Sequence, residues 1–99
     1  MPIYQARLQK NYENIINNIH PTSIVDHLIT EFILEIDDRQ VIESYPSDKQ
    51  KMRKLVEILM NVGERGYIEF LSSLRSDNYG DIADMIEKTE ITEDEMTML

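Results

Sequence analysis

The sequence contains no cysteine among its 99 residues. This absence excludes a disulfide framework, a thiolate zinc site and a cysteine nucleophile, and it fits a reducing compartment. The chain also lacks any run of 18 or more apolar residues, and residues 1–5 do not follow the basic-then-apolar order of a signal peptide. We therefore expect a soluble, cytoplasmic protein with no membrane partner.

Basic residues are scarce: 10 Lys and Arg stand against 19 Asp and Glu, which gives a net charge of -9. Nucleic-acid binding needs clustered Lys and Arg to neutralise phosphates, so this composition argues against it. The charge alternates along the chain, with sums of +1 for residues 1–25, -5 for 26–43, +2 for 44–75 and -7 for 76–99. This pattern predicts a folded body with regions of opposite charge, followed by an acidic tail.

The length predicts one domain with a single core. Apolar residues recur at helical spacing almost throughout, with little of the alternation typical of strands. We predict six helices, joined by connections of about two to five residues that favour an antiparallel bundle. The domain is expected to span residues 1–88, and residues 89–99 to form an acidic tail or the start of a following helix.

The first half of the chain predicts three helices. The first ends at His20-Pro21, because proline disfavours helical geometry in the residue before it. The second is expected to be capped by Thr22 or Ser23 and the third to be opened by Asp37 or Asp38. The apolar side chains expected in the core here are Leu8, Tyr12, Ile15, Ile16, Ile19, Ile24, Val25, Leu28, Ile29, Phe32, Ile33, Val41 and Ile42.

The second half predicts three more helices. Ser47 and Gln50 form the pattern of a capping box at the start of the fourth helix. Gly63 is predicted to be its left-handed C-cap, and Gly66 to permit a tight reversal before the fifth helix. Residues 77–80 predict a turn before the sixth. The side chains expected in the core here are Met52, Leu55, Val56, Leu59, Met60, Tyr67, Ile68, Phe70, Leu71, Leu74, Ile82, Met85 and Ile86.

Three stretches of this sequence carry a family resemblance: residues 20–28, residues 36–42, and residues 51–59 followed by 63–74. Over roughly residues 5–88 the chain resembles the caspase recruitment domain (CARD) family of the death-fold superfamily. The third stretch is most similar to CARDs of coiled-coil scaffold proteins of immune signalling. The resemblance implies a six-helix bundle of Greek-key topology. Residues 76–81 depart from the aromatic-rich stretch of the scaffold group.

The resemblance implies homotypic association, in which a basic surface of helices 1 and 4 joins an acidic surface of helices 2 and 3. Different surfaces that join head to tail propagate, so filaments and a concentration-dependent homo-oligomer are expected. The implied partners are other CARD-containing proteins and the domain itself; candidates are the B-cell lymphoma CARD adaptor, a caspase or another adaptor in apoptosis, inflammation or NF-kappaB activation. The implied basic residues are Arg7, Lys10, Lys51, Arg53 and Lys54, and the implied acidic residues are Asp26, Glu35, Asp37 and Asp38.

Other interpretations of the same residues remain open. The charged side chains can simply solvate helix faces, and Arg39 can be a local ion-pair partner within the acidic run. His27 and Glu31 lie four residues apart and could be two metal ligands, but the sequence supplies no further ligand beside them, so no metal and no cofactor are predicted. No catalytic residues are expected. The competing functions are a helical bundle that binds an unrelated partner helix and a small helical DNA reader.

Overall fold

The structure is a computed structural model of the chain and describes residues 1–97. Every regular element in this part of the chain is an α-helix, as predicted. The elements are α1 (Ile3–Lys10), α2 (Tyr12–Asn18), α3 (Pro21–Thr30), α4 (Ile36–Glu43), α5 (Asp48–Leu59), α6 (Glu64–Ser76), α7 (Gly80–Lys88) and α8 (Glu93–Thr97).

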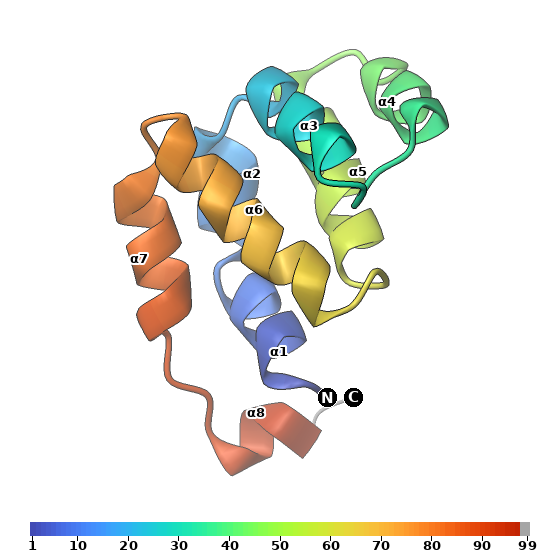
Figure 1. Cartoon of the computed structure of the whole chain (residues 1–99). Coiled ribbons are helices and arrows are strands. Elements are labelled where there is room, and N and C mark those ends of the chain that lie inside the picture. The colour runs from blue at the N-terminus through green and yellow to red at the C-terminus, as the bar shows by residue number, and fades with distance from the viewer. Residues whose placement is uncertain (98–99) are drawn as a thin grey trace.

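The helices form a bundle of 37 × 26 × 24 Å (Figure 1). Helix α6 packs between α3 and α7, while α5 packs against α2, α3 and α4. Helix α8 lies against α1 at the end of the bundle that also holds the N-terminus. None of the helices in residues 1–97 is long and apolar enough to cross a bilayer.

The predicted first helix is divided in two at Asn11, which the sequence pattern did not indicate. The buried Asn11 side-chain amide donates to the Arg7 carbonyl (2.8 Å) and to the Thr89 hydroxyl (2.9 Å). Asparagine side chains compete with the backbone for such bonds, which favours a break in the helix. The break therefore also ties α1 to the end of α7.

Helices α3 and α4 begin earlier than predicted. Helix α3 starts at Pro21 with His20 at its N-cap, because proline at the first helical position needs no backbone donor. Helix α4 starts at Ile36 with Glu35 at the N-cap, and the Glu35 amide donates to the Asp38 carboxylate (2.8 Å). The predictions of Thr22, Ser23 and Asp37 as caps are therefore wrong. Asp38 is the third residue of α4, and its side chain accepts from the amide of the cap residue Glu35.

The start of α5 is as predicted. The Gln50 amide donates to the Ser47 hydroxyl (3.2 Å), which satisfies one of the free donors of the first turn. Gly63, however, is the N-cap of α6 and not the C-cap of α5, and its φ of 91° is one that side-chain-bearing residues rarely adopt. Gly66 lies inside α6, where a Cβ atom would meet the Val62 and Ile33 side chains.

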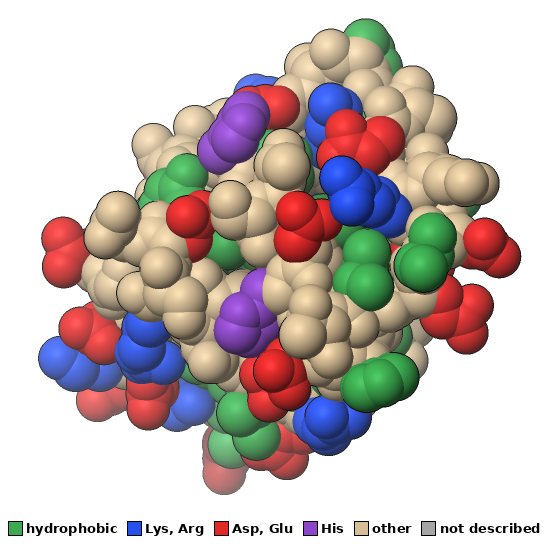
Figure 2. Space-filling model, turned by 45° about the horizontal axis from the view of Figure 1, so that its top comes forward, with side chains coloured by type: hydrophobic (Ala, Val, Ile, Leu, Met, Phe, Trp, Pro, Cys, Tyr) green, Lys and Arg blue, Asp and Glu red, His purple; other side chains and the backbone are tan. Residues whose placement is uncertain are grey.

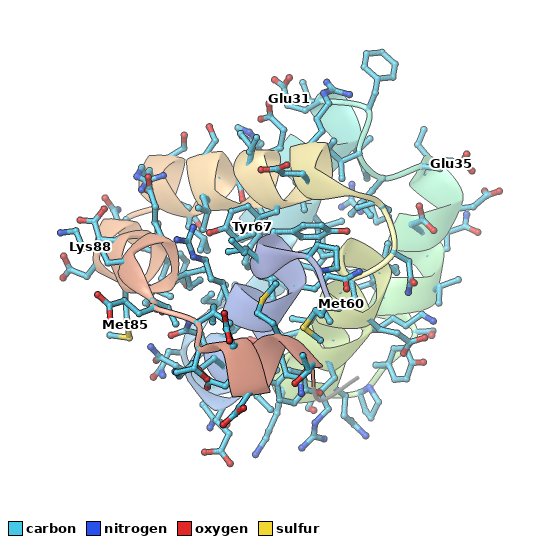
Figure 3. The ribbon with its side chains drawn as sticks, turned by 90° about the horizontal axis from the view of Figure 1, so that it is seen from below. Glu31, Glu35, Met60, Tyr67, Met85 and Lys88 are labelled. Carbon is cyan, nitrogen blue, oxygen red and sulfur yellow. The ribbon has the colours of Figure 1, made fainter. Side chains whose placement is uncertain are left out.

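The core is a single cluster to which α1 to α7 and the 31–35 connection contribute. Most of the predicted core residues are buried in it, and Tyr67 points into the bundle (Figure 3). Four predictions are wrong: Phe32, Val41, Ile68 and Met85 are exposed. Phe32 lies beyond the end of α3, and the other three lie on the solvent side of their helices, where helical spacing alone misplaces them.

Candidate functional site

The predicted basic residues of α5 differ in what they contact. Lys51 pairs with Glu43 of α4 (3.3 Å), and Lys54 pairs with Glu57 one turn along its own helix (3.1 Å). Arg53 is exposed, and within residues 1–97 it forms no ion pair. Of the three, Arg53 is the one whose charge is not already compensated inside the chain.

The predicted basic residues of α1 point toward the segment after α7. The Arg7 Nε atom donates to the Thr89 carbonyl (3.1 Å). The Lys10 ammonium donates to the Glu90 carbonyl (3.1 Å) and pairs with the Glu95 carboxylate (2.9 Å). The acidic segment 89–95 therefore occupies both side chains in this structure.

A shallow apolar groove lies between the α1–α2 break and α5. Its volume is about 460 Å³. Arg53 stands at its wall, and with Lys54 it also lines a neighbouring pocket of about 270 Å³ beside Tyr45. The groove thus brings one predicted basic residue next to apolar surface. Its lining is Gln9, Tyr12, Arg53, Val56, Glu57 and Met60.

The predicted acidic residues gather where α3 and α4 meet. Asp26 of α3 pairs with Arg39 of α4 (3.0 Å), so Arg39 is the local ion-pair partner that the sequence allowed for. Asp38 accepts a hydrogen bond from the amide of the N-cap residue Glu35, whereas Asp37 is exposed in the first turn of α4 and, among the described residues, has no ion pair. Figure 2 shows that acidic and basic side chains are interspersed on this side of the molecule. The predicted acidic residues therefore do not form one continuous acidic surface.

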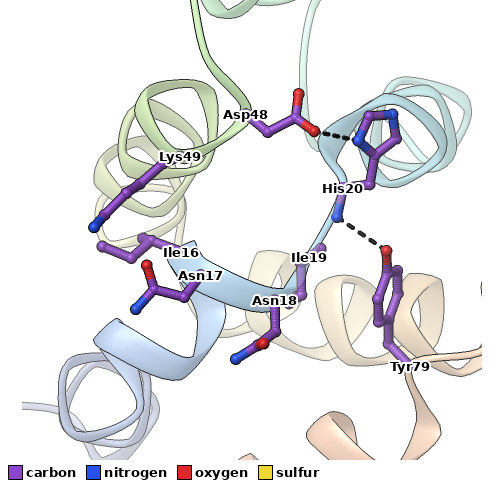
Figure 4. Close-up of a pocket in the computed structure, with 8 residues that line it drawn as sticks. All are labelled: Ile16, Asn17, Asn18, Ile19, His20, Asp48, Lys49 and Tyr79. Carbon is purple, nitrogen blue, oxygen red and sulfur yellow. Dashed lines mark hydrogen bonds and ion pairs between the residues drawn. The ribbon is translucent and has the colours of Figure 1, made fainter.

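A second hollow of about 400 Å³ lies where the end of α2 meets the start of α5 (Figure 4). His20 Nδ1 contacts the Asp48 carboxylate, and the His20 amide donates to the Tyr79 hydroxyl (2.9 Å). These contacts tie the α2–α3 connection to α5 and to the residue before α7. His20 lies outside the helices, as predicted.

Two charged groups have displaced pKa values, and both support contacts between elements. The pKa of Glu95 is lowered, chiefly because the Thr92 amide donates to its carboxylate and then because Lys10 is beside it. The pKa of Arg75 is raised, chiefly by its hydrogen bond to Glu87, with Asp84 also near. Arg75 is exposed and Glu95 is only partly buried, so neither shift indicates a catalytic site.

Sequence reasoning missed three features of these surfaces. It did not detect the groove, whose walls come from residues 9–12 and 53–60. It did not show that segment 89–95 contacts Arg7 and Lys10, although the opposite charges of that segment and α1 were a signal. It did not bring Glu69 beside His27, because the two lie 42 residues apart on different helices.

The described residues form an all-helical bundle whose surface carries basic and acidic side chains interspersed with one another. The model of the family described as "Caspase recruitment domain" matches residues 5–89. The chain belongs to the CARD family of the death-fold superfamily, as the sequence indicated.

The chain is also similar to part of several larger proteins. It is 27% identical over 82 residues to apoptotic protease-activating factor 1 of Danio rerio, which covers 83% of this chain. It is 23% identical over 79 residues to the Homo sapiens protein of that name and 24% over 80 residues to the Mus musculus one, covering 80% and 81% of this chain. The chain spans only about 6% of the length of these curated relatives. The likeness of residues 51–74 to scaffold CARDs stays a prediction.

Proposed function

We propose that this domain assembles signalling complexes by binding other CARDs, with its α1–α5 side against the α3–α4 side of the next domain. The observation that carries the proposal is that one predicted basic residue and one predicted acidic residue, on different helices, are exposed and have no ion pair among the described residues. Arg53 is exposed beside an apolar groove, and Asp37 is exposed at the start of α4. When two domains join through different surfaces, the pair still has one free surface of each kind. Further domains can therefore add at both ends, and the product is a chain or filament.

The strength of such a contact has a physical limit. Exposed ion pairs contribute about 0–1 kcal/mol each, and Lys51, Lys54 and Asp26 must first give up the pairs that they form within the chain. The groove beside Arg53 adds apolar area, which contributes about 25 cal/mol per Å² buried. Assembly should therefore depend on concentration and weaken with salt, with charge acting mainly on encounter rate and partner choice.

The names of the relatives support a role in apoptosis, since the matched proteins are called apoptotic protease-activating factors. The partners that we propose are proteins whose CARD has a surface of complementary charge, such as caspases or adaptors. The B-cell lymphoma CARD adaptor, inflammation and NF-kappaB activation remain predictions from the sequence resemblance, as does a cytoplasmic location. Clustering acts by raising the local concentration of whatever is attached to the domain.

Charge-reversal variants test the proposal by sedimentation across protein concentration and salt. Arg53→Glu should lower self-association at least tenfold, and so should Asp37→Lys. The matched controls are Lys88→Glu on α7 and Asp81→Lys, another exposed first-turn acid, and both should assemble like the unmodified chain. If each variant behaves like the control with the same change of charge, the effect is one of net charge and the two-surface proposal is wrong.

Mixing the two variants gives a sharper test. Arg53→Glu keeps its acidic surface and Asp37→Lys keeps its basic one, so the mixture has one functional contact. It should form 1:1 dimers that grow no further, although each variant alone stays monomeric. A mixture that stays monomeric would contradict head-to-tail association.

The apolar groove favours one alternative, a bundle that binds an unrelated amphipathic helix. Met60→Lys on the groove wall would separate the two functions. If it abolishes binding while Arg53→Glu has no effect, the helix-binding function is supported. If both reduce assembly, the groove is part of the CARD contact.

A further inference from the structure

Three possible metal ligands from two helices meet on the surface between α3 and α6. They are His27 of α3, Glu31 at the C-terminal end of α3 and Glu69 of α6, and their ligand atoms all lie within 4.8 Å of one another. His27 and Glu31 are four residues apart and share one helix face. The packing of α6 on α3 supplies Glu69, the third group that the sequence spacing lacked.

Among the described residues, the His27 imidazole has the Glu69 carboxylate at ion-pair distance but forms no hydrogen bond through its Nε2 atom. Its Nε2 atom is buried and has no hydrogen bond, although the side chain as a whole is 27% exposed. The nearest Glu69 oxygen is 3.5 Å away, beyond the range of a normal hydrogen bond. A buried polar atom left unpaired costs free energy, so a bound ligand at this atom would be favourable.

The spacing fits a small cation between the two side chains. Bonds of about 2.0–2.1 Å in a tetrahedral arrangement place neighbouring ligand atoms roughly 3.3 Å apart. The separation of His27 Nε2 and Glu69 Oε1 is close to this value. The two carboxylates would balance the charge of a divalent ion, and Arg65, which donates to the Glu31 carbonyl (3.0 Å), holds the end of α3 against α6.

We propose that His27, Glu31 and Glu69 bind one divalent transition-metal ion of the Zn²⁺ type, with water completing the coordination. An imidazole with two carboxylates suits Zn²⁺ and its neighbours in the first row, whereas Mg²⁺ and Ca²⁺ prefer oxygen ligands alone. The ion would join α3 to its packed neighbour α6. Because it binds the folded chain only, it stabilises the fold by an amount that rises with the logarithm of its concentration above the Kd.

The full chain allows a clean test because it has two histidines and no cysteine. Zn²⁺ titrated into the chelator-treated chain should bind at one site and raise the melting temperature by about 5–10 °C at ten times its Kd. Mg²⁺ at the same concentration should have no such effect. His27→Gln and Glu69→Gln should each weaken Zn²⁺ binding at least tenfold. His20→Gln is the matched control, because His20 also contacts a carboxylate, and it should bind normally.

NMR of the histidine side chains keeps the test informative if a variant fails to fold. Zn²⁺ should shift the His27 Nε2 resonance of the unmodified chain and leave the His20 ring unchanged. Equal effects of Zn²⁺ on both rings, loss of binding in His20→Gln alone, or no thermal shift in the unmodified chain would each overturn the proposal.

Discussion

The α3–α4 corner and the α5–α6 corner solve the same problem with different residues. Each reverses the chain with one residue at positive φ: Phe32 at 61° in the first and Gly63 at 91° in the second. Glycine adopts such a conformation freely, whereas a bulky side chain is strained there. Phe32 is also 89% exposed, while Phe70, the other phenylalanine, is fully buried in α6 after the second corner. In the α5–α6 region a glycine has the positive φ and the phenylalanine is buried, as local chemistry predicts. In the α3–α4 corner a phenylalanine has the positive φ and is also exposed, which is unusual on both counts.

The largest difference in unfolding free energy should appear when each of the two phenylalanines is replaced by alanine. Phe70→Ala removes a fully buried ring from the core and should lower the free energy of unfolding by about 3–5 kcal/mol. Phe32→Ala removes an exposed ring and should change it by no more than about 0.5 kcal/mol. Urea unfolding of both variants measures this contrast. Equal losses would mean that Phe32 packs in solution and that the two corners do not differ.

The next effect concerns the glycine of the second corner. Gly63→Ala forces a side chain into a strained backbone conformation, although there is open space around it, and should cost about 1–2 kcal/mol. Gly80→Ala is the control: it has the same open space, starts α7 and has no positive φ. That change should be neutral or slightly stabilising. Thermal unfolding of the pair isolates the contribution of the backbone angle.

A smaller gain should follow from relieving the first corner. Phe32→Asn replaces the strained residue by one that tolerates positive φ, as Asn78 does before α7 at 67°. We expect the domain to gain about 0.5–1 kcal/mol in unfolding free energy. Phe32→Leu, which keeps an apolar side chain and the strain, should gain nothing. If both variants gain equally, exposure of the ring and not backbone strain is the cause.

The smallest effect concerns the last corner, between α7 and α8, where charge holds the contact. The Thr92 amide at the start of α8 lowers the pKa of Glu95 most, and Lys10 of α1 lowers it further. The start of α8 and its contact with α1 are therefore both favoured above the ordinary glutamate pKa of 4.5. The contribution is lost as pH falls through the lowered pKa. The protection of the amides of residues 93–97 against hydrogen exchange, relative to the intrinsic rate at each pH, should fall at acid pH before that of α6. Glu95→Gln should remove this pH dependence, and Glu90→Gln should keep it.

The parts of the fold that the sequence predicted are those that local chemistry decides. Ser47 and Gln50 define the start of α5 because a hydroxyl and an amide three residues apart satisfy each other. The stripe from Met52 to Leu59 is buried because helical spacing puts it on one face. The same spacing misplaced Phe32 because it cannot tell that α3 ends at Thr30.

The parts of the surface that the sequence missed depend on contacts between distant segments. At the break in the first helix, the Asn11 side chain donates to Thr89, which lies 78 residues away in the sequence. Glu69 reaches His27 only because α6 packs on α3. From the sequence, Arg53 and Lys10 were both predicted as residues of a basic interface. The structure distinguishes them, because Lys10 pairs with Glu95 whereas Arg53 has no ion pair among residues 1–97.

The contact between the two ends of the bundle has a consequence for chain connectivity. The Met1 amino group donates to the Met96 carbonyl (3.2 Å), so the first and last described helices start and finish side by side (Figure 1). A short linker between these ends would close the chain into a ring without stretching it, and the exposed stretch 44–47 offers a place to open it again. A circular permutant that begins at Ser47 would present the α5–α6 unit first and bring α4 to the end of the chain.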